Sequence, residues 1–135
     1  MWAKTRPMIN LLLVGLGGGA GAIARYLTGV GYGRLFGPNQ PYLATLFINV
    51  LGGLLMGVLT GLLALKISEH GMRVRLLLGV GVLGGFTTFS TFSLEALQLI
   101  ERREYGLAAA YVVGSAVLSI LAVMIGLLAM RRLFA

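Results

Sequence analysis

Four long apolar segments, separated by short polar connections, dominate the hydrophobic pattern of the chain. They run from about 8 to 30, 42 to 65, 76 to 100 and 106 to 130. Each is near or above the ~20 apolar residues that a helix needs to cross a bilayer. The connections hold turn-forming or charged residues at 37–41 (GPNQP), 68–71 (SEHG) and 102–104 (RRE). The pattern predicts an all-α integral membrane protein with four transmembrane helices.

Residues 84–93 (GGFTTFSTFS) depart from this pattern inside the third apolar segment. Two glycines weaken the helix there, and five hydroxyl residues follow, interleaved with phenylalanines. A lipid-facing helix gains nothing from such a sequence. Non-helical backbone at membrane depth is tolerated only where protein buries it or where it lines a wet cavity. We therefore expect the third helix to be broken mid-membrane, with a functional site at the break.

The composition agrees with a membrane protein. Of the 135 residues, 58% are hydrophobic and only 11% are charged, whereas a soluble domain carries about a quarter charged residues. Four spans use most of the chain, so we expect one transmembrane domain over residues 1–135 and no soluble domain. The lack of cysteine excludes disulfides and thiolate chemistry.

The formal net charge is +7, and the basic residues gather at the ends of the segments. This favours contact with membrane lipids over binding of nucleic acid, because no soluble element carries a basic face. With a cytoplasmic N-terminus, seven basic residues lie on the cytoplasmic side against four on the other, a modest bias for a chain that could insert both ways. The seven are Lys4, Arg6, Lys66, Arg73, Arg75, Arg131 and Arg132, and the four are Arg25, Arg34, Arg102 and Arg103.

Glycines are frequent inside the spans. Gly53, Gly57 and Gly61 repeat at four-residue spacing, so they share one helix face on which another helix can approach closely. We expect most glycines to serve such packing. Gly84 and Gly85 are expected to be exceptions because of the hydroxyl-rich stretch that follows them.

Residues for enzyme catalysis are missing. The chain has no aspartate and one histidine, His70, which falls in a connection. Three of the four glutamates, Glu69, Glu101 and Glu104, lie at segment ends. Carboxylate metal cages and a Ser-His-Asp triad are therefore ruled out, and we expect no enzyme.

Several polar side chains lie inside apolar segments, where such groups are expensive and often mark transport pathways. Arg25 either snorkels to the interface or places a fixed positive charge at a pore mouth, where it would concentrate anions. Asn49 either bonds to another helix or donates its amide to an anion. Tyr111, Ser115 and Ser119 are four residues apart and form one polar stripe, which fits an ion path or a packing seam.

Phe89 and Phe92 are three residues apart and share a helix face. The edge of a phenyl ring carries positive partial charge, so rings aimed at a cavity could touch a small anion. Together with amide and hydroxyl donors and Arg25, these groups favour anions. Glu95, two residues after Ser93, cuts against this preference.

The chain resembles the CrcB/Fluc family of fluoride channels over all four spans. The resemblance rests on residues 21–26 (GAIARY), 49–52 (NVLG) and, most specifically, 84–95 (GGFTTFSTFSLE). It implies a fluoride-selective channel of the cytoplasmic membrane, which exports F⁻ passively and gives fluoride resistance. It further implies an antiparallel, dual-topology homodimer with two pores and a structural Na⁺ at its centre.

The resemblance also implies roles for individual residues. Backbone carbonyls of Gly84 and Thr87 would hold the Na⁺, and Arg25 would lie in a vestibule. The implied pore or fluoride-binding positions are Asn49, Phe89, Ser90, Thr91, Phe92, Glu95, Tyr111, Ser115 and Ser119.

Two other classes of protein stay open. A small multidrug-type, proton-coupled exporter is also a small four-helix dimer, but it needs a carboxylate in its first span, and no acidic residue precedes Glu69. A membrane subunit that packs against partners without transport would use the glycine faces. It would leave residues 84–93 and the Tyr111 stripe unexplained.

Overall fold

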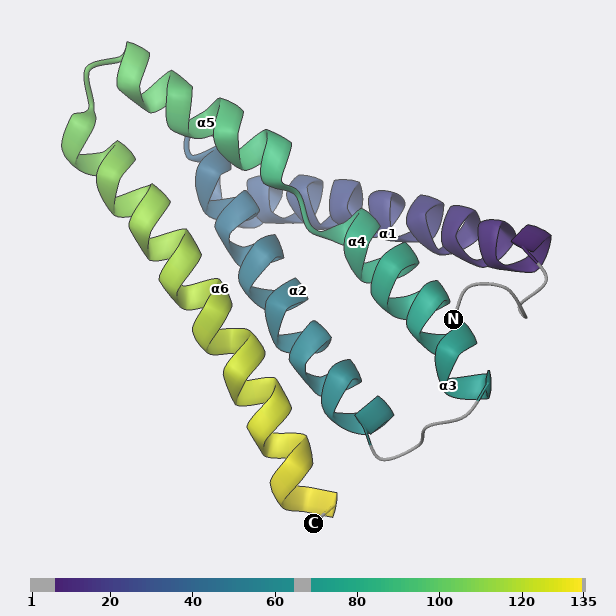
Figure 1. Cartoon of the computed structure of the whole chain (residues 1–135). Helices are drawn as coiled ribbons and strands as arrows, with labels where there is room; N and C mark the ends of the chain where they lie inside the picture. Colours follow the sequence, from purple (N-terminus) through teal and green to yellow (C-terminus); the bar gives the residue numbers. More distant parts are fainter. Residues whose placement is uncertain (1–6, 65–68, 135) are drawn as a thin grey trace.

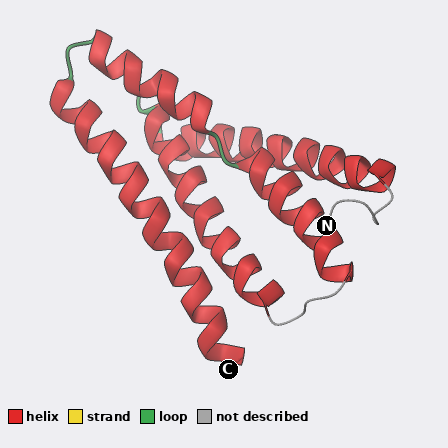
Figure 2. Ribbon diagram, in the orientation of Figure 1, coloured by secondary structure: helices red, strands yellow, loops and turns green. Residues whose placement is uncertain are grey.

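The computed structural model describes residues 7–64 and 69–134, and this part of the chain is entirely helical or loop (Figures 1 and 2). Its elements are α1 (Pro7–Phe36), α2 (Pro41–Ala64), α3 (Glu69–Val74), the π-helix η1 (Arg75–Leu83), α4 (Gly84–Phe86), α5 (Phe89–Glu101) and α6 (Tyr105–Phe134). Among the described residues, four segments are long and apolar enough to cross a membrane: α1, α2, His70–Glu101 and α6. The prediction of an all-α chain with four spans is confirmed.

Two helices continue beyond the predicted ends of their spans. Helix α1 runs to Phe36 rather than to about 30, and Gly29, Gly31 and Gly33 lie inside it without ending it. Gly37 takes a φ of 91°, and its N–H donates to the Gly33 carbonyl at 3.0 Å, as at a glycine-terminated helix end. Helix α6 runs to Phe134 rather than to about 130, with basic side chains in the last turn that suit the helix dipole. Residue 65, the end of the second predicted span, lies outside the described residues.

The connection predicted at 68–71 is wrong in its described part. Glu69 begins α3, which passes directly into η1, so His70 is an exposed helical residue rather than a turn residue. Ser68 lies outside the described residues.

The helices form two closely packed pairs. Helices α2 and α6 lie side by side and run in the same direction, while α1 crosses behind the others and packs on η1 and α4 (Figure 1). Helix α5 continues from α4 and meets the first turns of α6. The third span therefore touches α1 through its first half and α6 through its second half.

Glycines make both pairs possible. A Cβ added at Gly57 would collide with the Val123 carbonyl oxygen of α6, and one added at Gly126 would collide with the Leu54 carbonyl oxygen of α2. Added Cβ atoms at Gly53 and Gly61 would also lie within 3.0 Å of α6 atoms. The packing role predicted for the face of Gly53, Gly57 and Gly61 is confirmed.

The expectation that Gly84 and Gly85 stand apart from packing is wrong for Gly85. A Cβ at Gly85 would collide with the Gly18 carbonyl oxygen of α1, so this glycine lets α4 approach α1. At Gly84 the nearest atom would be the Gly79 carbonyl oxygen at 3.7 Å, an ordinary contact. Only Gly84 of the pair is therefore free of a packing requirement within the single chain.

Between α4 and α5 the backbone leaves the helical conformation for two residues. Thr87 has φ −76° and ψ 158°, and Thr88 has φ −149° and ψ 123°. Helix α5 then restarts at Phe89, and Thr88 is its N-cap, since the Thr88 hydroxyl accepts a hydrogen bond from the Thr91 N–H at 3.2 Å. We refer to Thr87 and Thr88 as the interruption.

Side-chain burial is concentrated where α5 meets α6. Ala96, Leu99, Ala108 and Tyr111 form a small buried cluster, with Phe92 packed against it. Many large apolar side chains elsewhere are exposed, including Leu11 and Leu16 on α1 and Ile120 on α6. Such a surface suits surrounding lipid rather than water.

Candidate functional site

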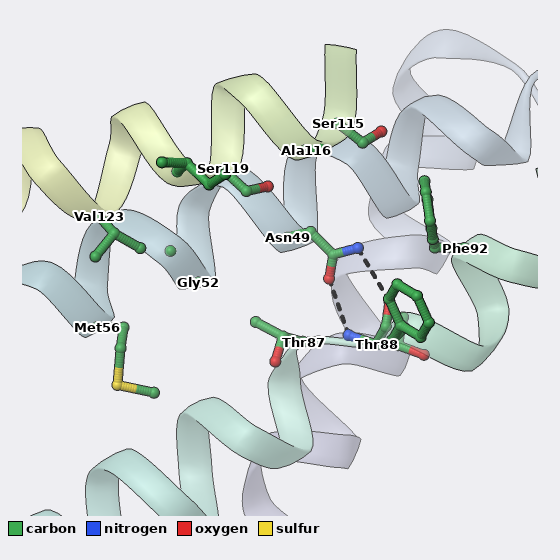
Figure 3. Close-up of a pocket in the computed structure, with 13 residues that line it drawn as sticks. Asn49, Gly52, Met56, Thr87, Thr88, Phe92, Ser115, Ala116, Ser119 and Val123 are labelled. Atoms are coloured by element: carbon green, nitrogen blue, oxygen red, sulfur yellow. Dashed lines mark hydrogen bonds between the residues drawn. The ribbon is translucent and has the colours of Figure 1, made fainter. Parts of the chain in front are cut away.

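The Asn49 amide of α2 bonds both backbone groups of Thr88 (Figure 3). The Thr88 N–H donates to Asn49 Oδ1 at 2.9 Å, and Asn49 Nδ2 donates to the Thr88 carbonyl at 3.0 Å. An uninterrupted helix would aim the Thr88 N–H at the Gly84 carbonyl. Of the two roles considered for Asn49, the interhelical hydrogen bond is confirmed. The amide nitrogen carries a second N–H, so donation to an anion stays a prediction.

Thr87 is held from three directions. Its N–H and its hydroxyl both donate to the Leu83 carbonyl, at 3.0 and 2.9 Å. Its methyl group occupies the space that a Cβ at Gly52 would fill. Its carbonyl accepts a hydrogen bond from Arg25 Nη1 of α1 at 3.2 Å. The guanidinium of Arg25 thus contacts the interruption directly.

A cavity of about 420 Å³ lies beside the interruption, between α2, the start of α5 and α6 (Figure 3). We call it the Asn49 cavity. Six of the predicted site residues line it: Asn49, Thr87, Phe89, Phe92, Ser115 and Ser119. These residues come from positions 49 to 119 of the chain, so the fold brings distant candidates to one place.

Ser115 has the least satisfied side chain of this cavity. It is only 5% exposed, and its hydroxyl has no hydrogen-bond partner among the described residues. Hydroxyls in membrane helices commonly bond back to their own backbone, as Ser93 does to the Phe89 carbonyl at 2.9 Å. Buried polar groups nearly always have hydrogen-bond partners. We therefore expect the Ser115 hydroxyl to bond a group outside the described residues, such as a water or an ion.

Aromatic rings line the wall between α5 and α6. The ring centroids of Phe89 and Phe92 are 5.5 Å apart, which confirms that the two share a face. The ring centroids of Phe92 and Tyr111 are 5.2 Å apart. The Tyr111 and Tyr42 rings pack edge to face, with centroids 5.5 Å apart. Phe92 is half-buried, whereas Phe89 is 79% exposed at the wall of the cavity. A single chain therefore covers one phenylalanine of the pair and leaves the other open.

A second cavity, of about 460 Å³, lies on the other side of the interruption, between α1, α2 and α5. We call it the Arg25 cavity. Arg25, Thr91 and Glu95 line it, and Thr88 lines both cavities. Thr88 therefore borders both cavities, one lined by hydroxyls and phenyl rings and one lined by side chains of opposite charge.

The Glu95 carboxylate is buried, at 8% exposure, and both of its oxygens are bonded. Thr45 donates its hydroxyl to Oε1 at 2.9 Å, and Tyr111 donates its hydroxyl to Oε2 at 2.7 Å. Hydrogen bonds to a carboxylate offset part of the cost of its burial. The sequence analysis did not identify Thr45 as a site residue, although Thr45 lies four residues before Asn49 and so on the same face of α2.

The three residues of the predicted polar stripe of α6 lie at two different places. Tyr111 belongs to the bonds around Glu95, while Ser115 and Ser119 face the Asn49 cavity. Ser90 and Gly84 line neither cavity. Ser90 is exposed, and its hydroxyl lies 3.4 Å from the Thr88 hydroxyl.

Thr88 is the second residue that sequence reasoning missed. A threonine directly before a helix start is a recognisable N-cap signal. The signal was available in the sequence, since Thr88 precedes Phe89, at which α5 begins.

The side chains that line the Asn49 cavity suit binding of a small anion better than acid–base catalysis or metal ligation by side chains. No group of three or more His, Cys, Asp or Glu side chains that could hold a metal occurs in residues 7–64 and 69–134. The Asn49 cavity offers an amide N–H, two serine hydroxyls and phenyl rings. Arg25 adds a guanidinium that bonds to a carbonyl.

Comparison with known proteins agrees with this geometry. Residues 12–127 match the family described as CrcB-like protein, Camphor Resistance (CrcB). A protein of Phenylobacterium zucineum (strain HLK1) is 57% identical over 128 residues, which cover 95% of this chain and 100% of the relative. Relatives from Caulobacter sp. (strain K31) and Agrobacterium fabrum (strain C58 / ATCC 33970) are 53% and 50% identical, over 94% of this chain and 98% and 100% of their own lengths.

All three relatives carry the name fluoride-specific ion channel FluC. The matched residues include all the candidate site residues and nearly the whole of the four apolar segments. This chain is a multi-pass membrane protein that belongs to the CrcB-like family.

Proposed function

We propose that this chain is a fluoride-selective ion channel of the cytoplasmic membrane, through which F⁻ leaves the cell passively. The channel would protect its host from fluoride. The relatives' names support fluoride as the ion. Within the chain, the observation that carries the proposal is the buried, unpartnered Ser115 hydroxyl in a cavity that also presents Asn49 and the phenylalanine pair.

The donor set fits a small anion. An ion that leaves water needs replacements for its hydration shell. For an anion these are N–H and O–H donors, and the Ser115 and Ser119 hydroxyls and the second N–H of Asn49 can supply them. The positive edges of Phe89 and Phe92 can add weaker contacts while their apolar bulk excludes water.

The working unit would be an antiparallel homodimer with two pores. A cavity of about 420 Å³ is many times the ~30 Å³ that one water occupies in the liquid, so one chain alone forms an open hollow rather than a narrow pore. Phe89, which is 79% exposed at the wall of the cavity, favours a second chain against this face. The modest charge bias between the two sides fits insertion in both orientations.

The interruption would lie mid-membrane. Thr87 and Thr88 fall near the middle of the apolar segment His70–Glu101. Non-helical backbone at that depth needs cover from protein or a wet cavity. The Asn49 amide, Arg25 and the two cavities supply such cover within one chain.

A structural Na⁺ would be held by the carbonyls of Gly84 and Thr87. The donors that a continuous helix would aim at these carbonyls are the N–H groups of Thr88 and Thr91, which donate to Asn49 and to the Thr88 hydroxyl instead. The residues therefore fit a cation, which would supply positive charge between carbonyls of two chains. Two carbonyls from each chain would give four oxygens at a two-fold axis.

The two other protein classes receive less support. A proton-coupled exporter needs a carboxylate in its first span, and α1 contains none. A packing subunit would have no use for a buried hydroxyl beside an open cavity. Substrate–proton exchange in a pH-jump experiment would favour the exporter, and a purified chain without transport would favour the packing subunit.

Growth in fluoride tests the proposal in cells. A bacterial strain without its own fluoride exporter should regain growth at millimolar fluoride when it expresses this chain. Ser115→Ala should lose most of this protection, because the hydroxyl at the cavity wall is removed. Ser93→Ala is the matched control, since the Ser93 hydroxyl bonds its own helix. Equal protection by both variants, at equal membrane levels, would remove Ser115 from the ion path.

A further inference from the structure

Arg25 supplies the hydrogen bond that the Thr87 carbonyl lacks. The Thr91 N–H, its donor in a continuous helix, bonds the Thr88 hydroxyl instead. Arg25 Nη1 reaches the same carbonyl from α1, 62 residues away in the chain, at 3.2 Å. A positively charged side chain therefore donates a hydrogen bond to one of the two carbonyls that we assign to Na⁺.

The bond from the Arg25 guanidinium leaves the Thr87 carbonyl oxygen able to accept a second partner. A carbonyl oxygen has two lone pairs, so Thr87 can accept from Arg25 and still face a second cationic partner. If Na⁺ binds as proposed, a fixed and a mobile positive charge share one acceptor.

We propose that Arg25 is a positioning residue that lowers and sets the Na⁺ affinity of the interruption through its charge. The inference rests on the proposed Na⁺ site. Two charges that share an acceptor lie well inside the Debye length of ~8 Å at physiological ionic strength, so salt screens their repulsion only weakly. In the proposed dimer each chain brings its own Arg25, which doubles the effect.

Loss of carbonyl orientation would act in the opposite direction, but it is the smaller effect. The Thr87 N–H and hydroxyl both bond the Leu83 carbonyl, and the Thr87 methyl group is fixed against Gly52. These contacts hold the Thr87 backbone independently of the Arg25 bond. Removal of the Arg25 charge should therefore tighten Na⁺ binding rather than weaken it.

The experiment measures the Na⁺ concentration that gives half of the full rise in unfolding temperature of the purified protein in detergent. Choline replaces Na⁺ at constant ionic strength. Arg25→Gln should shift this concentration down by about tenfold or more, because a repulsion at short range is lost. Arg25→Lys keeps the charge and should stay within about threefold of the natural chain, because the repulsion is retained.

Arg34→Gln is the matched control. It removes the same charge from α1 at an exposed position, nine residues or about 13 Å further along the helix, and it should leave the Na⁺ response unchanged. Should Arg25→Gln fail to assemble, Arg25→Lys decides the matter, since a much weaker Na⁺ response there would show that geometry rather than charge matters.

Three results would overturn the inference. The first is weaker Na⁺ binding by Arg25→Gln, and the second is an equal shift of the half-maximal Na⁺ concentration in Arg34→Gln. The third is a natural chain whose unfolding temperature does not depend on Na⁺. The last result would remove the cation itself. It would leave the fluoride channel to be judged by its own transport assay, so the two proposals can fail separately.

Discussion

The Asn49 side chain replaces helical hydrogen bonds at Thr88, where the chain leaves the helix and enters it again. Asn49→Ala would leave the Thr88 N–H and carbonyl without these bonds in a partly buried place. We expect a loss of about 1–3 kcal/mol for each group that stays unsatisfied, together with reduced fluoride flux. Thermal unfolding in detergent measures the first effect and liposome efflux the second.

Asn39→Ala is the control for Asn49, because Asn39 is exposed in the connection between α1 and α2. An Asn49→Ala protein as stable as Asn39→Ala would contradict the bridging role. Stability loss with unchanged flux would confine Asn49 to structure and remove it from the ion path.

The two hydroxyl bonds to Glu95 should be coupled. Glu95→Gln turns one carboxylate oxygen into an NH₂ group that faces a hydroxyl donor, so one bond to a charged acceptor is lost, at about 1.5–3 kcal/mol. Tyr111→Phe should therefore be less harmful in a chain that already carries Glu95→Gln than alone, with a coupling energy of about 0.5–3 kcal/mol. Chemical unfolding of the four proteins of the cycle gives this number.

Glu101→Gln supplies the control for the Glu95 cycle, since Glu101 is exposed at the end of α5. It should change stability little and show no coupling to Tyr111→Phe. Additive effects of Glu95→Gln and Tyr111→Phe would show that the bond seen at 2.7 Å does not contribute to stability.

Individual site residues could be predicted where their type is unusual for a membrane helix. Asn49, Phe92 and Ser115 stand out among aliphatic neighbours, and the fold places them at one cavity. Thr45 does not stand out, because a threonine in a membrane helix usually bonds its own backbone. Its bond to Glu95 depends on the approach of α5, which no local pattern encodes. The bond from Arg25 to the interruption depends in the same way on the crossing of α1.

At the scale of helices, contact between α2 and α6 depends on small residues at particular positions of one face. Gly126→Ala would drive a Cβ into the Leu54 carbonyl oxygen and the Val58 nitrogen, both rigid backbone atoms. Overpacking of this kind costs about 1–3 kcal/mol. We expect Gly126→Ala to lower the unfolding temperature clearly, by circular dichroism of the purified protein.

Gly114 lies on the same helix with nothing within 4 Å of an added Cβ. Gly114→Ala should be neutral or stabilising in the folded chain, because alanine is the better helix former by up to about 1 kcal/mol. Equal destabilisation by both variants would mean that general glycine flexibility, and not the contact with α2, is what α6 requires.

The elements themselves were largely predictable because hydropathy decides where a chain crosses a membrane. Helix ends were less predictable, since α1 and α6 run past the ends of their apolar segments. Helix α1 ends just before Gly37, and α6 extends to the last described residue. The role of Gly85 was mispredicted because its packing partner, Gly18, comes from a different helix. The double glycine looked like a local signal, whereas one of its members serves a long-range contact.

At the scale of the whole molecule, the proposed dual topology predicts that each connection faces both sides of the membrane. The chain has no native cysteine, so Asn39→Cys gives a single reactive site in an exposed turn. We expect a membrane-impermeant maleimide to label about half of the protein in intact cells and all of it after permeabilisation, because the positive-inside bias is modest. Labelling of nearly all or nearly none of the protein in intact cells would indicate one orientation and exclude an antiparallel dimer.

The most direct test of the central claim is ion efflux from liposomes that contain only this purified chain. A fluoride electrode would follow release from fluoride-loaded vesicles, with chloride-loaded vesicles of the same lipid composition measured in parallel. The account predicts rapid fluoride release, little chloride release, and a strong loss of flux when Phe89 or Phe92 is replaced by a non-aromatic residue. A folded dimer that releases no fluoride, or that releases chloride equally well, would contradict it.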